Sequence, residues 1–459
     1  MGDAAQRASD LPHSWAIAAI LVLGFTVCVA VNWPGHINYD SAVQLAEGRA
    51  GQYQNWHPAI MSWMLGVTDA AVPGVCLFVV FDTLLLYGSV LSLLWLAPKP
   101  SRFAAALALL CILTPQFAIY PGVAWKDVLF SGAGVASFVC LAHGAARWDN
   151  RQCRYALLAA SWAFAALAAL ARQNGVVVIA FAAIAAGWIA MRHEKARVVG
   201  FRYGFGILAL TACLAALVFA ALSLRFEPGY DATADQIKQQ RVFDLVGAAV
   251  LRPDLPLDWI RAASPAFERR IHTQGVQLYR AASHDSIADA PGFNVALDTV
   301  DDDVITRQWL DLVEQHPGLY LRLRAETFRW VVLTPDPNVC PPLEVGVWAP
   351  AAILKGLGMP ARKDARDQSL GDYAFRLSGT PVGSHLTYII LGCGALIVLL
   401  RRRRPADLAI ACMLAASLAY MASFFVISIA CDYRYLLFVD VAAMTAILYL
   451  ALTMSPRRG

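Results

Sequence analysis

Long apolar runs, separated by polar connections, dominate this chain. A helix needs roughly 20 apolar residues to cross the hydrocarbon core of a membrane, and ten runs of about that length can be found. The pattern therefore predicts an all-α polytopic membrane protein with about ten transmembrane helices. The expected spans are residues 14–32, 73–97, 102–119, 128–146, 155–171, 175–191, 204–224, 384–400, 406–430 and 433–453.

A long polar segment, residues 225–383, separates the seventh run from the eighth. Between Ile305 and Val332 its apolar residues recur at helical spacing, broken by His316-Pro317. We interpret this segment as a mainly helical domain outside the membrane. The expected domains are an N-terminal transmembrane module (1–224), this extracytoplasmic domain (225–383) and a C-terminal transmembrane module (384–459).

Lys and Arg residues gather in alternate connections between the expected spans, and this placement predicts the orientation of the helices. Cytoplasmic connections carry the excess of Lys and Arg in membrane proteins, so both termini are expected on the cytoplasmic side. The basic groups that share this face are Lys99 and Arg102; Arg147, Arg151 and Arg154; Arg192, Lys195, Arg197 and Arg202; Arg401–Arg404; and Arg457 and Arg458.

The apolar stretch at residues 57–72 is the weak point of this topology. If it crossed the membrane, every later connection would change sides and the pattern of basic residues would invert. We therefore interpret it as a juxtamembrane or re-entrant helix within a first outer loop, residues 33–72. The first run, 14–32, has no small-residue cleavage site after it, and we interpret it as a retained helix rather than a signal peptide.

Composition agrees with a membrane protein and argues against other classes. The 459 residues are 58% hydrophobic and 15% charged, with a mean hydropathy of +0.53, which is more apolar surface than a soluble domain buries. The net charge of +4 is small, and no basic cluster interleaved with aromatic residues points to nucleic acid. Most of the ten cysteines lie in apolar runs; only Cys340 and Cys431 could meet outside the membrane as a disulfide, and no spacing suggests zinc.

The first outer loop carries Asp40 and His57 in an aromatic setting that includes Tyr39. A carboxylate just above the membrane suits a general base that acts on a sugar hydroxyl, and aromatic rings stack on sugars. The alternative is an ordinary solvated loop whose aromatic residues form an interfacial belt. Both interpretations stay open on this pattern alone.

Three basic residues stand on the outer face, where cations are scarce. Arg172 and Arg434 lie in tight outer turns and Lys126 begins the fourth span, so all three suit the binding of an interfacial phosphate. The structural alternatives are a snorkelling Lys126 beside an Asp at a helix N-terminus, and an Asp–Arg pair in the last turn. Each of these basic residues has polar or aromatic neighbours in the sequence that could take part in the same site. They are Trp125, Asp127, Asn174, Asp432 and Tyr435.

Two carboxylates, Asp82 and Asp440, lie within apolar runs. Charged residues inside a membrane are costly and point to function by default, although each of these could be protonated or bonded to a neighbouring helix. No basic partner inside the membrane is apparent for either, so we rank both below the outer residues.

The order of these motifs resembles the glycosyltransferase C (GT-C) superfamily of membrane enzymes, and more narrowly a poorly characterised bacterial branch of it. The resemblance rests on the Asp and the following HP of the first outer loop, the P…WKD…F element, the R-x-N turn, the segment QWLDLVEQHPGLYLRLRAETF and the RY near the end. It extends over nearly the whole chain. Each motif is short, so the likeness depends on their order and topology.

This resemblance implies an inverting glycosyltransferase of the bacterial inner membrane. It would move a hexose or pentose from a polyprenyl-phosphate donor to a cell-envelope glycan, lipid or protein on the extracytoplasmic face. Several GT-C branches hold a metal with paired acidic residues, whereas Ser41 follows Asp40 here, so we predict no metal or other cofactor. The residues that the resemblance implicates are Asp40 as general base; Lys126, Arg172, Asn174, Arg434 and Tyr435 at the lipid phosphate; and His57, Tyr39, Trp125, Asp127 and Asp432 in support.

A transporter or flippase of a lipid-linked or anionic substrate is the main alternative, and a polysaccharide polymerase or ligase is another. Transporters often show internal repeats and binding sites at the midplane of the membrane. No repeat is apparent here, and the candidate residues gather at one surface, which favours an enzyme. The sequence does not specify the sugar, the acceptor, the length of the lipid or the oligomeric state.

Overall fold

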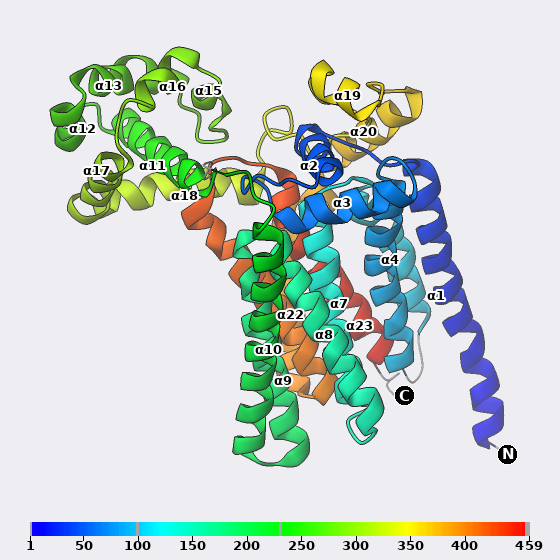
Figure 1. Cartoon of the computed structure of the whole chain (residues 1–459). Helices are drawn as coiled ribbons and strands as arrows, with labels where there is room; N and C mark the ends of the chain where they lie inside the picture. Colours follow the sequence, from blue (N-terminus) through cyan, green and yellow to red (C-terminus); the bar gives the residue numbers. More distant parts are fainter. Residues whose placement is uncertain (1, 98–100, 229–231, 455–459) are drawn as a thin grey trace. The chain divides into compact units, whose positions relative to one another are not determined.

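The computed structural model describes residues 2–97, 101–228 and 232–454, which form helices joined by turns and isolated β-bridges (Figure 1). The chain folds into two compact units. Unit 1 comprises residues 1–227, 342–420 and 436–459, and unit 2 comprises residues 228–341 and 421–435. Residues 342–383, which the sequence pattern placed in the polar insert, therefore belong to unit 1.

Within the described ranges, nine helices are long and apolar enough to cross a membrane, or ten if one bent pair forms a single span. The expected all-α polytopic fold is confirmed. The protein is accordingly a multi-pass membrane protein. The helices are α1 (Gly2–Asn32), α4 (Cys76–Ser92, extended by a 3-10 turn at Leu93–Leu96), α7 (Lys126–Ala146), α8 (Arg151–Ala171), α9 (Val176–Glu194, preceded by the turn η3, Gln173–Gly175), α10 (Arg197–Ser223), α21 (His385–Arg402), α22 (Pro405–Ile427) and α23 (Leu437–Thr453, preceded by the turn η6, Tyr433–Leu436).

The third expected span, residues 102–119, is not one straight helix. Helix α5 (Arg102–Leu113) ends before Pro115, and the short elements α6 (Pro115–Ala118) and η2 (Tyr120–Gly122) continue at an angle of 69° to it. Proline lacks an N–H and disfavours the helical conformation at the residue before it. Thr114 is accordingly extended, with φ −77° and ψ 149°.

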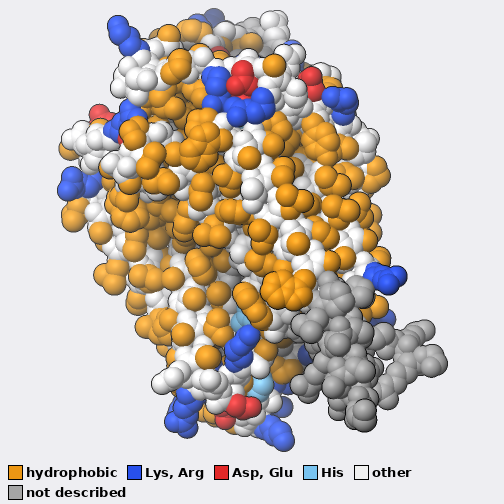
Figure 2. All heavy atoms as spheres, turned by 90° about the vertical axis from the view of Figure 1, so that its right-hand side faces the viewer, with side chains coloured by type: hydrophobic (Ala, Val, Ile, Leu, Met, Phe, Trp, Pro, Cys, Tyr) orange, Lys and Arg blue, Asp and Glu red, His pale blue; other side chains and the backbone are white. Residues whose placement is uncertain are grey.

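Helices α7 and α23 form the centre of unit 1. In their apolar windows 94% and 89% of the residues are buried, whereas only 17% are buried in α10, which faces outward. Small residues between Ser131 and Ser137 of α7 allow its neighbours to approach closely, as at interfaces between membrane helices. Figure 2 shows a broad field of hydrophobic side chains between two ends at which Lys and Arg side chains gather, as expected for a surface in contact with lipid.

Helices α2 (Tyr39–Ala50) and α3 (Ala59–Ala71) form a hairpin at one end of the spans (Figure 1). With 13 residues and a rise of 1.5 Å per residue, α3 measures about 20 Å, which is too short to cross a core of about 30 Å. It runs across the ends of the spans rather than along them. The interpretation that residues 57–72 do not cross the membrane agrees with this arrangement.

The two helices of the hairpin touch backbone to backbone. A Cβ atom added at Gly48 would meet the Ser62 carbonyl oxygen at 2.2 Å, and one at Gly66 would meet the Gly48 oxygen at 2.4 Å. Arg49 closes the hairpin by donating two hydrogen bonds to Asp69, at 2.8 and 2.7 Å. These bonds hold the pKa of Asp69 below its usual value. The close approach fixes the position of α2, which carries Asp40.

Replacing Gly48 with Ala is expected to destabilise the protein by about 1–3 kcal/mol, because the new methyl group meets backbone atoms that cannot move aside. Alanine is otherwise the better helix former. The matched control is Gly356→Ala in α19 (Ala351–Leu357), where a Cβ meets nothing within 4 Å and stability should be unchanged or higher. Thermal unfolding in detergent measures both, and equal stability of the two variants would contradict the close contact.

Unit 1 has two chemically different ends. Helices α2, α3, α19 and α20 (Ala365–Ser378) lie at one, which we call the α2–α3 end (Figure 1). The connections α7–α8, α9–α10 and α21–α22 lie at the other and carry the arginine groups. We call this the basic end. The separation matches the two faces that the sequence pattern predicted.

Unit 2 is a helical domain with its own apolar core around Phe243, Phe267 and Phe293. The break expected at His316-Pro317 is present between α17 and α18. Its helices are α11 (Ala232–Leu251), α12 (Asp258–Ala263), α13 (Pro265–Arg270), a π-helical turn (Ile271–Gly275), α14 (Val276–Leu278), α15 (Asp285–Ala288), α16 (Pro291–Leu297), α17 (Asp302–Gln315) and α18 (Pro317–Leu333).

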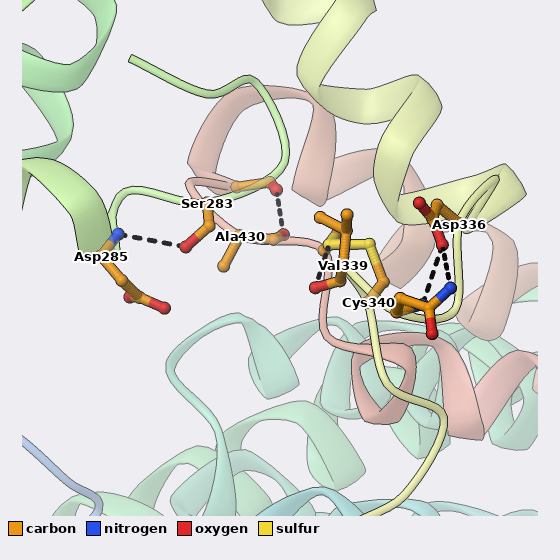
Figure 3. The surroundings of a disulfide bond; sticks show 9 residues. Ser283, Asp285, Asp336, Val339, Cys340 and Ala430 are labelled. Carbon is orange, nitrogen blue, oxygen red and sulfur yellow. Dashed lines mark hydrogen bonds between the residues drawn. A yellow bond between two sulfur atoms is a disulfide. The ribbon is translucent and has the colours of Figure 1, made fainter. Parts of the chain in front are cut away.

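A set of hydrogen bonds and a disulfide attach residues 421–435 to the rest of unit 2. The buried Arg324 guanidinium donates to Asp244 at 2.8 Å and to the carbonyls of Phe425 and Ser428 at 2.8 and 2.7 Å. Cys340 and Cys431 form a disulfide, next to the bridge between Ser283 and Ala430 (Figure 3). The disulfide that the sequence allowed but did not predict is therefore present.

Candidate functional site

Two loops that are far apart in sequence pair at the α2–α3 end and bring the candidate residues together. His36 and Val123 form a parallel β-bridge, in which the His36 N–H donates to the Gly122 carbonyl at 2.9 Å. The Ala124 N–H in turn donates to the His36 carbonyl at 3.0 Å. This pairing places the start of α2 beside the start of α7.

The first turn of α2 is fixed by side-chain hydrogen bonds. The Asn38 side chain accepts from the N–H of Ser41 at 3.1 Å, which caps the helix. The Ser41 hydroxyl shares its single hydrogen between the Asn38 side-chain oxygen, at 2.8 Å, and the Ala124 carbonyl, at 2.5 Å. Ser41, which stands where a second acidic residue would support a metal site, thus ties α2 to the loop before α7. Asp40 lies between these anchored residues.

Asp40, His57 and Lys126 form a row at this junction. An Asp40 carboxylate oxygen lies 3.9 Å from His57 Nε2, and His57 Nδ1 lies 3.3 Å from Lys126 Nζ. The His57 side chain is 5% exposed and that of Asp40 is 24% exposed. The imidazole is therefore enclosed between the two charged groups, while the carboxylate keeps access to solvent.

The contact with Lys126 indicates which nitrogen of His57 carries the proton. A lysine ammonium has three N–H donors and no acceptor, so His57 Nδ1 accepts and the imidazole proton lies on Nε2, facing Asp40. In this form His57 is neutral. It lies beside Asp40 and contacts the Lys126 ammonium at the N-terminus of α7, where the helix dipole adds positive potential.

Asp127 and Arg172 form a second pair one residue further along α7. The Asp127 side chain is 1% exposed and that of Arg172 is 11% exposed, so the arginine is neutralised within the protein. Tyr420 of α22 lies close to both residues and to Asn174, and its ring packs against Phe130 with centroids 4.4 Å apart. Arg172 of the R-x-N turn is therefore the ion-pair partner of Asp127, the last residue of the WKD motif.

The segment after unit 2 returns to unit 1 and braces the first outer loop. Ile37 forms a parallel bridge with Val347, and the Gly346 N–H donates to His36 Nδ1 at 3.0 Å. His36 Nε2 lies 2.9 Å from the Asn32 side-chain oxygen. Asp367 lies 3.6 Å from His36 and is also paired with Arg362 at 3.0 Å. Residues 342–383 thus support the site.

Burial lowers the pKa of His36 to about 4, although the nearby carboxylate of Asp367 acts in the opposite direction. In the unfolded chain the imidazole takes up a proton near pH 6.5. The stability that depends on neutral His36 is thus complete above that value, is lost progressively as the pH falls, and is gone near pH 4. Acid should therefore loosen the first outer loop.

Replacing His36 with Gln is expected to lower the thermal midpoint at pH 7, because the contacts with Asn32 and Gly346 are disturbed. The difference between wild type and variant should shrink steadily as the pH falls from 6.5 to 4. Only wild type has an imidazole at position 36 that is protonated in the unfolded chain and stays neutral in the folded protein over this range. Midpoints measured in detergent across this range test the idea. A difference that does not change with pH would show that His36 does not control acid stability.

Other candidates occupy different surroundings. Tyr39 is 45% exposed beside Asp40, whereas Trp125 is 4% exposed and packs near Tyr120, with ring centroids 5.9 Å apart. In unit 2, Arg434 pairs with Asp432 at 2.9 Å, and its guanidinium lies 6.0 Å from the centroid of the neighbouring Tyr435 ring. The Tyr435 ring stacks on Phe424 at 5.2 Å. The Asp–Arg pair considered for this turn is therefore present.

One of the two embedded carboxylates has a basic partner, contrary to the expectation from the sequence. Asp440 lies 2.9 Å from Nδ1 of His385 and accepts from the Gln116 amide at 3.3 Å. Both His385 and Asp440 are fully buried. Asp82 is 1% exposed, and its carboxyl oxygens have no hydrogen-bond partner among the described residues. His385 stands at the start of a span, 55 residues from Asp440, so no local pattern pointed to the pair.

The described part of the chain holds no group of three or more His, Cys, Asp and Glu side chains close enough to bind a metal ion. The row of Asp40, His57 and Lys126 includes only two such side chains and a cation. What this arrangement can do is accept a proton at Asp40 and stabilise an anion near Lys126.

Comparisons with known proteins give one distant likeness. No protein-family model matches the chain, and no curated protein matches it significantly. Among solved structures it is similar to the archaeal oligosaccharyltransferase AglB from Archaeoglobus fulgidus, in complex with an inhibitory peptide and a dolichol-phosphate. The match has 14% identity and a TM-score of 0.41, covers 95% of this chain, and spans 50% of the other protein.

Proposed function

We propose that this protein is an inverting glycosyltransferase of GT-C type. It would transfer a sugar from a polyprenyl-phosphate donor to an acceptor at the α2–α3 end of unit 1. The observation that carries the proposal is the row of Asp40, His57 and Lys126, in which a solvent-accessible carboxylate and an ammonium lie on either side of one buried imidazole. The resemblance of the sequence motifs to the GT-C superfamily supplies the class of reaction.

The reaction needs one base and one stabilised leaving group. Asp40 takes the proton of the acceptor hydroxyl as its oxygen forms a bond to the anomeric carbon of the sugar. The bond between that carbon and the phosphate oxygen breaks, and polyprenyl phosphate leaves with the bonding electrons. Lys126 and the N-terminus of α7 stabilise the negative charge that develops on the phosphate. A single displacement inverts the configuration of the anomeric carbon.

The other candidates have supporting roles in this scheme. Asp127 orients Arg172, and we assign Arg172 and Asn174 to the lipid phosphate. The exposed Tyr39 ring provides a stacking surface for the sugar or the acceptor. Arg434 and Tyr435, with their partner Asp432, lie in unit 2, and their part in binding phosphate stays a prediction from the sequence resemblance.

The proposed orientation places the α2–α3 end outside the cytoplasm of a bacterium, with both termini inside. Basic connections favour the cytoplasm, and they lie at the opposite end. Within unit 1, the backbone of Tyr53 at the α2–α3 end pairs with that of Phe226. Unit 2 contains the disulfide Cys340–Cys431, and disulfides persist in oxidising compartments such as the periplasm. A cell-envelope acceptor fits this location.

Turnover by the full chain in proteoliposomes tests the function. The protein is given a panel of polyprenyl-phosphate hexoses and pentoses with an extract of cell-envelope acceptors, and free polyprenyl phosphate is measured. We expect acceptor-dependent release with at least one donor, and a product of inverted anomeric configuration. Absence of release across the panel, together with movement of the donor or its head group across the bilayer, would instead establish a transporter or flippase.

A further inference from the structure

A cavity lies between α4, α7 and α8, in the half of unit 1 nearer the basic end. It has a volume of about 670 Å³, within the range of small-molecule sites. Its wall is made almost entirely of apolar side chains, among them Phe81, Leu85, Trp95, Val139 and Leu157. Along α7 the lining runs from Ala136 to Arg147, which corresponds to about 16 Å. The shape is that of a lengthwise groove for a hydrocarbon chain.

Polar groups in this groove are confined to the basic end. Arg147, which follows the last residue of α7, lies 2.7 Å from His143 Nδ1, and His143 Nε2 lies 3.0 Å from the Ser92 hydroxyl. A guanidinium only donates, so Nδ1 accepts, Nε2 carries the proton, and His143 is neutral. The imidazole thus holds the arginine in place without compensating its charge.

Arg147 keeps its positive charge at the mouth of an apolar groove. Its side chain is half-buried, and among the described residues no carboxylate lies within 4.0 Å of it. An apolar groove that ends in an arginine with no carboxylate partner in the described part of the chain is complementary to an amphiphile with a chain and an anionic head. Basic pockets between membrane helices on the cytoplasmic side are sites of this kind for phospholipid head groups.

We propose that the groove between α4, α7 and α8 binds one anionic phospholipid of the membrane leaflet at the basic end. Its phosphate is held by Arg147, and one of its acyl chains fills the apolar length of the groove. This site is separate from the candidate transferase site at the α2–α3 end, and it does not depend on the proposed function. The bound lipid would contact both α4 and α8, and it would fill the space between them that the protein's own side chains leave open.

Gly88 on α4 provides a way to close the groove without disturbing the helices around it. It lines the cavity, and a Cβ added there would meet only the Leu84 side chain, at 3.9 Å. A phenylalanine at this position therefore projects into the groove. Gly394 on α21 is the matched control, since a Cβ there meets nothing within 4 Å and the residue does not line the groove.

Native mass spectrometry of the full chain in mild detergent tests the site, with phosphatidylglycerol and phosphatidylcholine as probes. Wild type should retain one phosphatidylglycerol and prefer it to phosphatidylcholine at least fivefold. Arg147→Gln should abolish the preference, and Gly88→Phe should lower retention of both lipids at least fivefold. The controls Arg401→Gln, an exposed arginine at the same end, and Gly394→Phe should remain within twofold of wild type.

Equal retention of both lipids by wild type, or equal losses in the control variants, would overturn the proposal and indicate lipid bound nonspecifically around the protein. A change from dimer to monomer in Gly88→Phe, with no change in bound lipid, would show that a second copy of the chain occupies the groove instead. Circular dichroism and gel filtration confirm that each variant is folded. If Gly88→Phe fails to fold, the lipid preference of Arg147→Gln decides the matter.

Discussion

Replacing Asp40 with Asn is expected to lower the rate of sugar transfer by about 10²–10⁴-fold, the usual contribution of a general base. The amide keeps the size of the side chain but cannot take the proton of the acceptor. Donor binding should be nearly unchanged, because the phosphate contacts Lys126 and not Asp40 in the proposed site. Release of polyprenyl phosphate under single-turnover conditions measures the effect.

The matched control for this variant is Asp372→Asn. Asp372 is an exposed carboxylate of α20 at the same end of unit 1, and its replacement should leave the rate within twofold of wild type. The thermal midpoint of Asp40→Asn should also match that of wild type, because Asp40 is 24% exposed and its contact with His57 is long, at 3.9 Å. Transfer at the wild-type rate in Asp40→Asn would exclude Asp40 as the base.

Replacing Arg172 with Gln is expected to destabilise the protein by about 3–5 kcal/mol, because Asp127 is left as a buried carboxylate without its cation. A loss of donor binding in this variant alone would therefore be ambiguous. The double variant Asp127→Asn with Arg172→Gln removes both charges and should recover most of the lost stability. Thermal unfolding and donor affinity are measured for both single variants and the double variant.

If Arg172 serves the lipid phosphate, the stable double variant should still bind the donor at least tenfold more weakly than wild type. The Asp127→Asn variant, which keeps the arginine, should bind the donor at least as well as wild type. Recovery of normal donor affinity in the double variant would instead mean that the Asp127–Arg172 pair is purely structural. The comparison thus separates a phosphate-binding role of Arg172 from a purely structural one.

The transmembrane architecture could be predicted from the sequence because it follows from local composition. An apolar run of the right length must be a helix in lipid, and the alternation of basic connections predicts that residues 57–72 do not cross. The bend within residues 102–119 has a local cause in Pro115, which ends α5 early. The sequence shows that Pro115 lies within the apolar run, but it does not show the direction in which the chain continues after the proline.

The candidate site was only partly predictable because its contacts join distant segments. Asp40, His57 and Lys126 were each singled out on one face, but the row that they form depends on the pairing of His36 with Val123, 87 residues apart by number. Asp127 and Arg172 are separated by 45 residues, so their ion pair has no local signature. The bracing of the first outer loop by residues 346–367 joins segments more than 300 residues apart, and no motif indicated it.

The central claim, that the donor phosphate binds at the α2–α3 end, can be tested by photocrosslinking. The wild-type chain in proteoliposomes is exposed to a polyprenyl-phosphate sugar with a diazirine in its first isoprene unit, and the adducts are mapped by mass spectrometry. We predict that they cluster in residues 120–130 and 172–178, at the start of α7 and in the turn before α9, and that excess unlabelled donor removes them. Adducts confined to the basic end, around residues 147–154 and 401–404, would contradict the account.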